Sequence, residues 1–392
     1  MKEWEKWTRN CLFLLSSFEI LEGKRLFKRL FFLFLLPCLL LSSEIGRAFK
    51  EGKLKGHVGT LINADFVGDS TYLDLSTSLA YETANFYGYK FFASMWFNPK
   101  LYEVNRGFRD NKTWLEFPEL GVNFYNTRLN FGFDAGRFAY QRDWINNYVQ
   151  GLSFFHSPTS WVDYEITWIN RSAWIDYYRV RNYEGAGNWI GGLWASANFK
   201  IPNTTLVLTP YAYSVANHFW SPAIKARMDF FFPNISGKLE AMATLLFYTA
   251  YHDKKHQGDS LMYWSDLTWK DTRGRYEAGG GIMVSAIDGV RDIDIFGQNT
   301  GFEDTTGLFD SNMTTLYAFG KFNFKYDISL KTSMRTSISP STDVIFGWET
   351  RANYFPIKDL EVGLDLILIM GSEKLGLGSD QGKMRAYLQY HF

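Results

Sequence analysis

Cysteine, histidine and net charge are all scarce in this sequence of 392 residues. It contains two cysteines and six histidines, and its 41 basic residues balance its 41 acidic ones. Both cysteines, Cys11 and Cys38, lie near the start, so the rest of the chain has no thiol for disulfides, thiolate metal sites or a cysteine nucleophile. No histidine stands in a recognisable nucleophile motif, and we expect no enzyme activity. The balanced charge gives no reason to expect a nucleic-acid partner.

Long hydrophobic runs are also missing after Phe49, where no apolar stretch approaches the 18 residues of a membrane helix. Aromatic residues nevertheless make up 18% of the chain, while mean hydropathy is −0.20 and charged residues reach 21%. This composition is too polar for a helical membrane protein and too aromatic for an ordinary soluble one. A large transmembrane β-barrel reconciles the two, because half of each strand faces lipid and half faces water.

The first 48 residues have the features of an export signal. A basic stretch over residues 24–29 is followed by the apolar segment Leu30–Leu41. This segment has about a dozen residues, too few for a spanning helix of roughly 20. Small residues precede a cleavage point after Ala48. We therefore expect a signal peptide with an N-terminal extension at 1–48 and a barrel at 49–392, with a retained anchor as the alternative.

Strict alternation of apolar and polar residues recurs along the chain. The C-terminal segment "KMRAYLQYHF" and the segment "LEVGLDLILIM" each have one apolar and one polar face, the mark of a β-strand. Many such segments about ten residues long favour an outer-membrane barrel over a secreted β-sandwich. No repeat of 20 to 50 residues is visible, which argues against a solenoid.

The alternation predicts an all-β fold, an antiparallel barrel of about 18 strands, or 16 if two weak segments merge. The predicted strands begin near Gly56, Tyr72, Tyr87, Trp114, Arg128, Val149, Trp161, Asn188, Thr204, Ser221, Lys238, Leu261, Tyr276, Thr314, Ile328, Thr342, Asp359 and Lys383. Tight links alternate with longer polar ones, which is typical of short periplasmic turns and longer extracellular loops.

Basic side chains gather on the predicted water-facing side of the strands. We predict that they line a solute pathway: Arg171, Lys225, Arg227, Lys321, Lys325, Lys331, Arg335 and Arg351. Five of them fall on three consecutive strands between Thr314 and Tyr354, where neighbouring strands about 4.8 Å apart would form one basic strip. Such a strip favours anions. The alternative is that each is a solvated charge paired with an acid such as Asp163, Glu165, Glu361 or Asp365.

Three further features carry predictions. The acidic link Asp288–Met313 is expected to be a solvated loop, with a divalent-cation site or a lid folding into the pore as alternatives. Tryptophans near strand ends are expected to form the aromatic girdle at the membrane interfaces: Trp114, Trp161, Trp189 and Trp264. The terminal Phe392, with Tyr390, is predicted to be the signal that outer-membrane assembly machinery reads.

Two stretches resemble the OprD-like porins of Gram-negative bacteria, especially members from the Campylobacter and Helicobacter lineage. They are "FKEGK" followed by "YETANFYG", and "DAGRFAYQRDWINNYVQGLSF" with Gly136, Arg137, Arg142, Asp143 and Gly151 to Ser153. The resemblance implies an eighteen-stranded barrel that passes small solutes, often carboxylates, amino acids or peptides, along basic side chains. The link "YQRDWINNY" is short for an inward-folding loop, so the pore would be narrowed by another segment.

These observations favour a passive outer-membrane porin for small anionic or zwitterionic solutes. It would need no cofactor or metal and would contact outer-membrane lipid, as a monomer or a homotrimer. A surface adhesin or structural barrel without transport is the alternative.

Overall fold

The computed structural model describes residues 43–67, 70–105, 113–187, 189–232, 236–251, 258–324, 327–340, 344–371 and 380–392. The chain divides into two units, residues 1–52 and 53–392. In the first, α3 (Ser43–Lys50) is a short helix that contains Ala48. Cleavage after Ala48 stays a prediction. No helix among the described residues is long and apolar enough to cross a bilayer.

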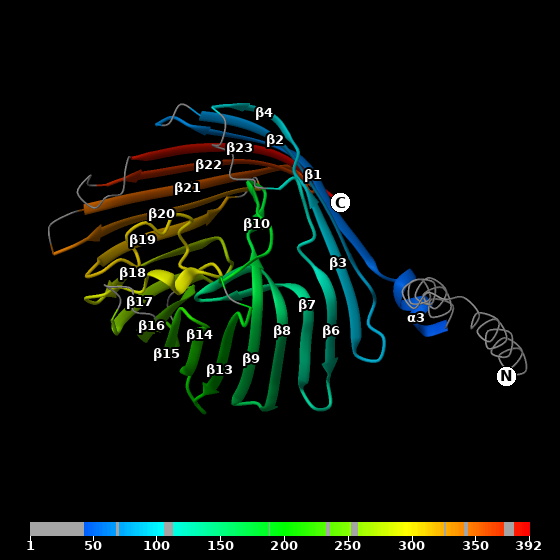
Figure 1. The fold of residues 1–392 in the computed structure, drawn as a ribbon, viewed down its shortest axis with the longest axis horizontal. Helices are drawn as coiled ribbons and strands as arrows, with labels where there is room; N and C mark the ends of the chain where they lie inside the picture. The colour runs from blue at the N-terminus through cyan, green and yellow to red at the C-terminus, as the bar shows by residue number, and fades with distance from the viewer. Residues whose placement is uncertain are drawn as a thin grey trace, which may run out of the picture. The chain divides into compact units, whose positions relative to one another are not determined.

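Eighteen long strands in the described part of the second unit form one antiparallel sheet that closes on itself. Each strand pairs with its neighbour along the chain, and the last pairs with the first (Figure 1). In order they are β1 (Lys53–Asp65), β2 (Ser70–Glu82), β3 (Tyr89–Phe97), β6 (Leu120–Asn126), β7 (Phe131–Arg142), β8 (Ile145–Thr159), β9 (Val162–Ala173), β13 (Gly192–Lys200), β14 (Val207–Val215), β15 (Phe219–Phe231), β16 (Gly237–Ala250), β17 (Ser260–Asp271), β18 (Tyr276–Ser285), β19 (Thr314–Asn323), β20 (Ile328–Ile338), β21 (Val344–Ile357), β22 (Leu360–Met370) and β23 (Gln381–His391).

Shorter segments extend this wall. Three of them pair with β2, β3 and β9 respectively: β4 (Lys100–Val104), β5 (Leu115–Glu116) and β12 (Glu184–Gly185). A small separate hairpin is formed by β10 (Ile175–Asp176) and β11 (Arg179–Val180), and η1 (Arg291–Asp294) is a 3-10 turn. The predicted barrel of about 18 strands is therefore confirmed.

On several strands, apolar side chains face outwards and the side chains between them point into the barrel. On β22, Leu364 is 47% exposed, whereas its neighbour Asp365 is 2% exposed. On β23, Leu388 and Tyr390 are exposed while Tyr387 and Gln389 are buried. The outer surface is therefore apolar, as expected of a membrane barrel, whereas the interior holds both polar side chains such as Asp365 and an apolar cluster that includes Ile169 and Leu246.

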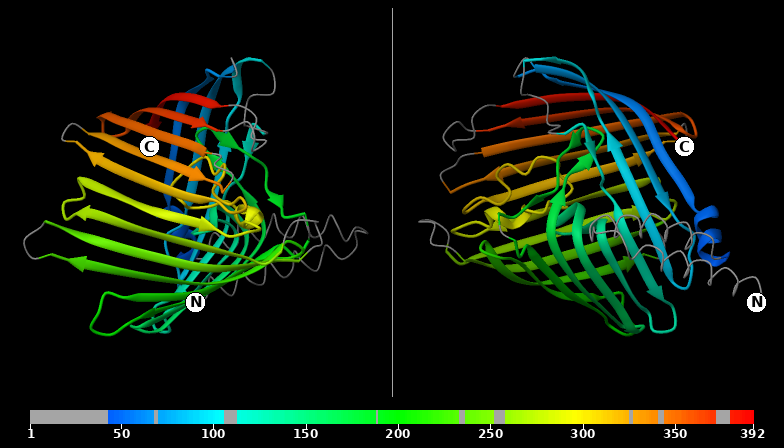
Figure 2. Two further views of the ribbon diagram at one scale, coloured as in Figure 1. Left: turned by 90° about the vertical axis from the view of Figure 1, so that its left-hand side faces the viewer. Right: turned by 45° about the vertical axis from the view of Figure 1, so that its right-hand side comes forward.

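Tight links join the strands at one end of the barrel, and every long link lies at the other (Figure 2). The tight turns use residues with left-handed backbone, such as Asn203 with φ 62° and Gly274 with φ 65°. Asparagine and glycine adopt this conformation at low cost, so the local sequence sets these turns. The predicted alternation of short and long links is confirmed in part, because the end with the long links also carries short ones, such as those between β7 and β8 and between β14 and β15.

The structure differs from the sequence-based prediction in the start of the fourth strand and in the location of Trp264. The fourth strand begins at Leu120 instead of near Trp114, because Pro118, which has no backbone N–H, separates β5 from β6. Trp264 does not belong to a membrane girdle: its side chain is 6% exposed, and its Nε1 donates to Tyr317 Oη at 2.7 Å inside the barrel. Trp114, Trp161 and Trp189 are exposed.

Candidate functional site: a charged cavity between two inward loops

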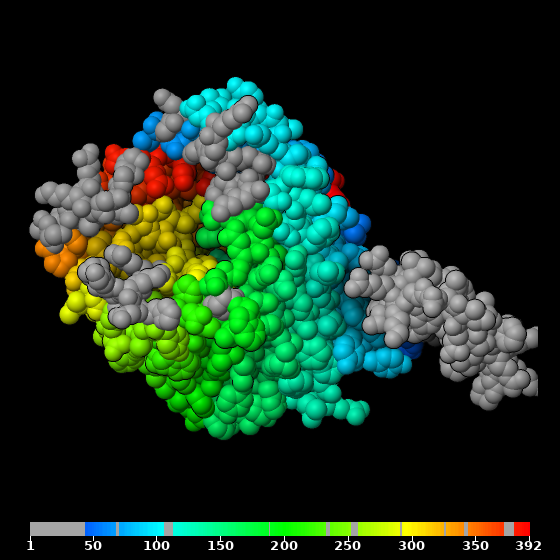
Figure 3. All heavy atoms as spheres, viewed as in Figure 1, coloured from blue at the N-terminus to red at the C-terminus, as the bar shows by residue number. Residues whose placement is uncertain are grey.

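Two long links fold into the barrel instead of projecting from it. The β9–β13 loop (residues 174–191) carries the β10–β11 hairpin, and the β18–β19 loop (residues 286–313) carries η1. Figure 1 shows the hairpin in green and the 3-10 turn in yellow within the ring of strands. In the space-filling view, the surface is hollowed beside the green residues (Figure 3).

The β18–β19 loop is packed against the wall, so its expected role as a solvated loop is wrong. Six of its apolar side chains are almost fully buried in the main core cluster: Val290, Ile293, Phe296, Phe302, Leu308 and Phe309. The prediction considered only the acidic residues of this loop and overlooked its spaced apolar residues. Burial of these apolar side chains keeps the loop packed inside the barrel and away from water. Of the alternatives, the inward-folding lid agrees with the structure.

Backbone hydrogen bonds fix this loop to the short link between β7 and β8. Asn146 N donates to Phe296 O at 3.2 Å, and Asn299 N donates to Asp143 O at 2.9 Å. Trp144 in that link is fully buried, and its Nε1 donates to Tyr211 Oη at 2.9 Å. The short link therefore supports the inward loop, and that another segment narrows the pore stays a prediction.

Glu303, on the β18–β19 loop, is the point where the two loops and the wall meet. Its Oε1 lies 2.5 Å from Arg385 Nη1 on β23 and 3.6 Å from Arg179 Nη2 on β11. Its Oε2 lies 4.0 Å from Arg351 Nη2 on β21. Burial alone would raise the pKa of the Glu303 carboxyl, but Arg385 and Arg179 outweigh it and hold the pKa below its usual value.

Two wall residues hold the backbone on either side of this carboxylate. Glu349 on β21 accepts hydrogen bonds from Glu303 N at 2.9 Å and Asp304 N at 3.0 Å. Arg335 on β20 donates through Nη1 to Thr306 O at 2.7 Å and pairs through Nη2 with Asp304 Oδ1 at 3.2 Å. Because Arg335 is 1% exposed, these contacts replace its hydration.

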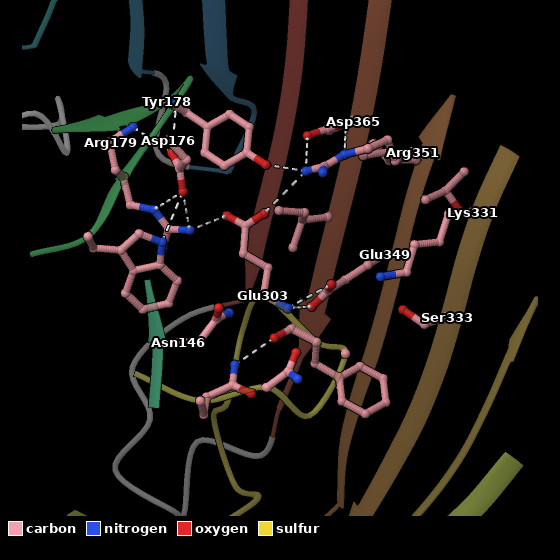
Figure 4. A pocket seen from close by; sticks show the side chains of 18 of the residues that line it. Asn146, Asp176, Tyr178, Arg179, Glu303, Lys331, Ser333, Glu349, Arg351 and Asp365 are labelled. Carbon is pink, nitrogen blue, oxygen red and sulfur yellow. Dashed lines mark hydrogen bonds and ion pairs between the residues drawn. The ribbon is translucent and has the colours of Figure 1, made fainter. Parts of the chain in front are cut away.

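A cavity of about 330 Å³ lies between the two loops and the wall. Figure 4 shows Asp176, Tyr178 and Arg179 of the β9–β13 loop facing Arg351 and Asp365 of the wall. Its lining also includes Lys331, Ser333, Glu349 and Glu303. Both signs of charge thus face one small space, an arrangement suited to dipolar or charged solutes.

Eight charged residues form a continuous row across eight neighbouring strands, from β16 to β23. Each is the direct cross-strand partner of the next, and we call them the charged row: Lys238, Lys270, Glu277, Lys321, Lys331, Arg351, Asp365 and Arg385. Members at one end line a cavity of about 390 Å³ near the tight turns. Lys331, Arg351 and Asp365 line the cavity between the loops, so the row joins the two spaces.

The predicted pathway residues occupy different environments. Lys321, Lys331 and Arg351 belong to the charged row, whereas Arg335 lies outside it beneath the β18–β19 loop. On β15, Lys225 Nζ lies 2.7 Å from Asp143 Oδ1, and Arg227 is exposed.

The remaining two predicted bases lie apart from the charged row. Arg171 is exposed and follows a bulge, since Gln150 pairs with Arg171 but Gly151 pairs with Ile169. The extra residue shifts the alternation, so Arg171 points to the opposite side from Ile169. Lys325 is outside the described residues.

Sequence reasoning missed three residues of the site: Arg179, Glu303 and Arg385. Arg385 is on the polar face of the last strand, directly opposite Asp365 of the preceding strand, and this cross-strand pairing was the signal that would have added it to the strip. Arg179 and Glu303 are on loops, where no periodicity reports orientation. Among the described residues, no group of three or more His, Cys, Asp or Glu side chains is arranged to hold a metal ion.

The two predicted assembly residues lie at the closing seam between β1 and β23. Tyr390 pairs with Val58 and faces outwards, 48% exposed. Phe392 exchanges two backbone hydrogen bonds with Gly56, at 2.9 and 3.0 Å, and a Cβ on that glycine would collide with the Phe392 ring. The terminal aromatic therefore packs on the first strand.

Several solved structures have a similar fold. The chain is similar to OccD3 (OpdP) of Pseudomonas aeruginosa, with TM-score 0.68 and 11% identity over 88% of this chain and 92% of that one. It is also similar to OccAB4 of Acinetobacter baumannii, with TM-score 0.70 and 11% identity over 87% and 98%. OpdK of P. aeruginosa, solved with vanillate, gives TM-score 0.69 and 9% identity over 88% and 99%.

At these identities the likeness shows the fold alone, the eighteen-stranded barrel of the OprD/Occ outer-membrane proteins. The sequence itself matches no family model and no curated protein. The suggested Campylobacter and Helicobacter lineage stays a prediction.

Proposed function

We propose that this protein is an outer-membrane porin through which small hydrophilic solutes diffuse passively, with a preference for anionic or zwitterionic ones. The charged row is the observation that carries the proposal. Six of its eight members are bases, and it joins two cavities inside a barrel of OprD/Occ fold. Basic side chains along a confined path concentrate anions and replace part of their hydration.

Lys321 and Lys331 are the members that support an anion path most directly. They are direct partners on adjacent strands, and Lys331 is also the partner of Arg351. Like charges directly opposite each other destabilise a sheet. Among the described residues neither lysine has an acid within 4 Å, whereas Arg351 Nη2 lies 2.8 Å from Asp365 Oδ2. Because neither lysine is in a direct ion pair, both ammonium groups are available to a passing anion.

Acids close to the same path support passage of zwitterions. Asp176, Glu349 and Asp365 line the inner cavity with Lys331 and Arg351. An amino acid or short peptide would orient its carboxylate towards the bases and its ammonium group towards these acids. OpdK, a protein of similar fold, has been solved with the organic anion vanillate, which supports this solute class.

The test is single-channel conductance of the refolded mature barrel in a planar bilayer under a KCl gradient. The reversal potential should indicate anion preference. Replacing both lysines, Lys321→Gln with Lys331→Gln, should lower the anion-to-cation permeability ratio about two- to tenfold by reducing the local potential.

The matched control is Lys358→Gln, because Lys358 is exposed in the turn between β21 and β22 and contributes to net charge without lining the cavity. It should leave the ratio unchanged. A folded barrel without conductance, recognised by its heat-sensitive gel mobility, would instead favour an adhesin or structural barrel.

A further inference from the structure

We propose that Glu303 is a built-in occupant of the arginine cluster, defined as Arg179, Arg351 and Arg385, and that the carboxylate of a passing solute must displace it. The inference rests on the proposed function and adds to it a competing side chain of the protein's own. Displacement of Glu303 would release the β18–β19 loop from the cluster.

The geometry of the cluster is that of carboxylate recognition. Three guanidinium groups come from separate elements, β11, β21 and β23, and all have a nitrogen within 4.0 Å of a Glu303 oxygen. Planar guanidinium groups are the side chains best matched to a carboxylate. The ring of Tyr178 lies beneath Arg385, 4.1 Å from its Cζ, and fixes the direction of that side chain.

Glu303 does not satisfy the cluster fully. Three guanidinium groups have more N–H donors than one carboxylate can accept. Arg385 has a side chain that is 5% exposed, yet its Nε has no hydrogen-bond partner among the described residues. A buried donor without a partner is costly, and a ligand with a less constrained carboxylate could satisfy more donors than Glu303 does.

Charge balance gives a second argument. The cluster and Lys331 contribute four positive charges, and Asp176, Asp365, Glu349 and Glu303 contribute four negative ones. Asp176 pairs with Arg179 at 3.1 Å and Asp365 with Arg351 at 2.8 Å. Glu303 is therefore the acid whose departure leaves an uncompensated positive charge, which an incoming carboxylate would neutralise.

The position of Glu303 makes displacement possible. It belongs to a loop and not to the barrel wall, and its carboxylate borders the cavity of about 330 Å³. A second contact, from Glu349 to the backbone of Glu303 and Asp304, holds the loop independently of the carboxylate. The carboxylate can thus leave the cluster while this backbone contact still holds the loop near the wall.

The test measures binding of acetate to the detergent-solubilised mature barrel by saturation-transfer NMR. Wild-type protein should bind acetate weakly, because the apparent affinity falls by the fraction of time for which the site is vacant. Glu303→Ala should bind acetate about tenfold more tightly or better. Adding Arg385→Gln to that variant should abolish the gain.

The matched control is Glu349→Gln, which loosens the loop but keeps the competing carboxylate. It should not bind acetate as tightly as Glu303→Ala does. Should Glu303→Ala fail to fold, Glu303→Gln removes the charge at the same length and should give part of the gain.

Equal acetate affinity in the wild type and the Glu303 variants would overturn the inference, as would a gain that survives Arg385→Gln. Because binding is measured without conduction, this result is separate from the porin test. If the wild type conducts but the Glu303 variants bind acetate no more tightly, this inference alone is wrong. If the folded barrel does not conduct, the proposed function is wrong.

Discussion

At the scale of single residues, bases that alternation assigns to the same face have different tasks. Lys331 lines the cavity and has no acid within 4 Å among the described residues. Arg335, four residues further along β20, is almost fully buried and contacts Asp304 and Thr306 of the inward loop. The difference comes from the loop above the strand, which covers one residue and not the other.

Arg335→Ala should therefore release the β18–β19 loop. Removing one partner of a buried ion pair leaves Asp304 without its guanidinium and should destabilise the packed loop by about 3–5 kcal/mol. We expect faster protease cleavage within residues 288–310 and larger, noisier single-channel conductance, with the barrel itself still heat-modifiable on gels.

The informative control at this position is Arg335→Lys, which keeps the charge but lacks the planar fork that reaches two acceptors. The protease resistance and the conductance of this variant should lie between those of the wild type and of Arg335→Ala. If the alanine variant keeps wild-type protease resistance and conductance, Arg335 does not hold the loop.

At the scale of elements, the β18–β19 loop combines an apolar surface with buried acids. Burial raises the pKa of the Asp294 carboxyl to about 6, with neighbouring Asp292 adding to the effect. Opposing this, Asp294 accepts a backbone hydrogen bond and Thr305 Oγ1 lies 3.5 Å from its Oδ2. Asp292 in turn lies 3.3 Å from His218 Nδ1 on the link between β14 and β15.

Packing of this loop should accordingly depend on pH. A carboxyl whose pKa is higher in the packed loop than in the open one favours packing fully below about pH 4, and this contribution is lost as pH rises through about 6. Hydrogen exchange of residues 288–310, corrected for intrinsic rates, should show at least about tenfold less protection at pH 8 than at pH 4.

Asp294→Asn isolates the effect, because an amide stays neutral throughout this range. The variant should keep its loop protection at pH 8. His218→Gln serves as the companion control, because His218 Nδ1 lies 3.3 Å from Asp292 Oδ2 beside Asp294. A pH dependence that persists unchanged in Asp294→Asn would assign the effect to another group.

At the scale of the whole molecule, the seam between the first and last strands decides whether the barrel closes. A phenylalanine ring covers a glycine at each end of this seam: Phe392 over Gly56, and Phe66 over Gly382. Both rings are about half exposed, which places them on the lipid-facing side. An aromatic ring over a glycine shields backbone that has no side chain of its own.

Comparison of Phe392→Ala with Phe66→Ala distinguishes a role of Phe392 in closing the barrel from a role as a signal for the assembly machinery. Both changes should lower the thermal stability of the refolded barrel by similar amounts, because each uncovers one glycine. In cells, Phe392→Ala should reduce the folded fraction in the outer membrane more than Phe66→Ala does, as expected of a terminal residue read by assembly machinery. Equal loss in cells would mean that Phe392 acts through the seam alone.

Much of this architecture was readable from the chain because its determinants are local. The period of two set the number of strands and the side to which Leu388 or Asp365 points. Asparagine and glycine set the tight turns. Predictions were wrong where the alternation of a regular strand does not apply. Arg171 lies beyond a bulge, and the buried apolar residues of the β18–β19 loop follow no strand period.

The sequence by itself determined an antiparallel barrel and the face of each strand that carries the apolar side chains, since alternation is a property of each strand and requires no partner. Tertiary structure decided which inward charges meet. Strand register aligned Lys331 with Arg351, and the register of β22 against β23 added Arg385 to that row through Asp365. Burial of apolar loop residues then brought Glu303 to the arginine cluster, a contact between distant segments that no local pattern encodes.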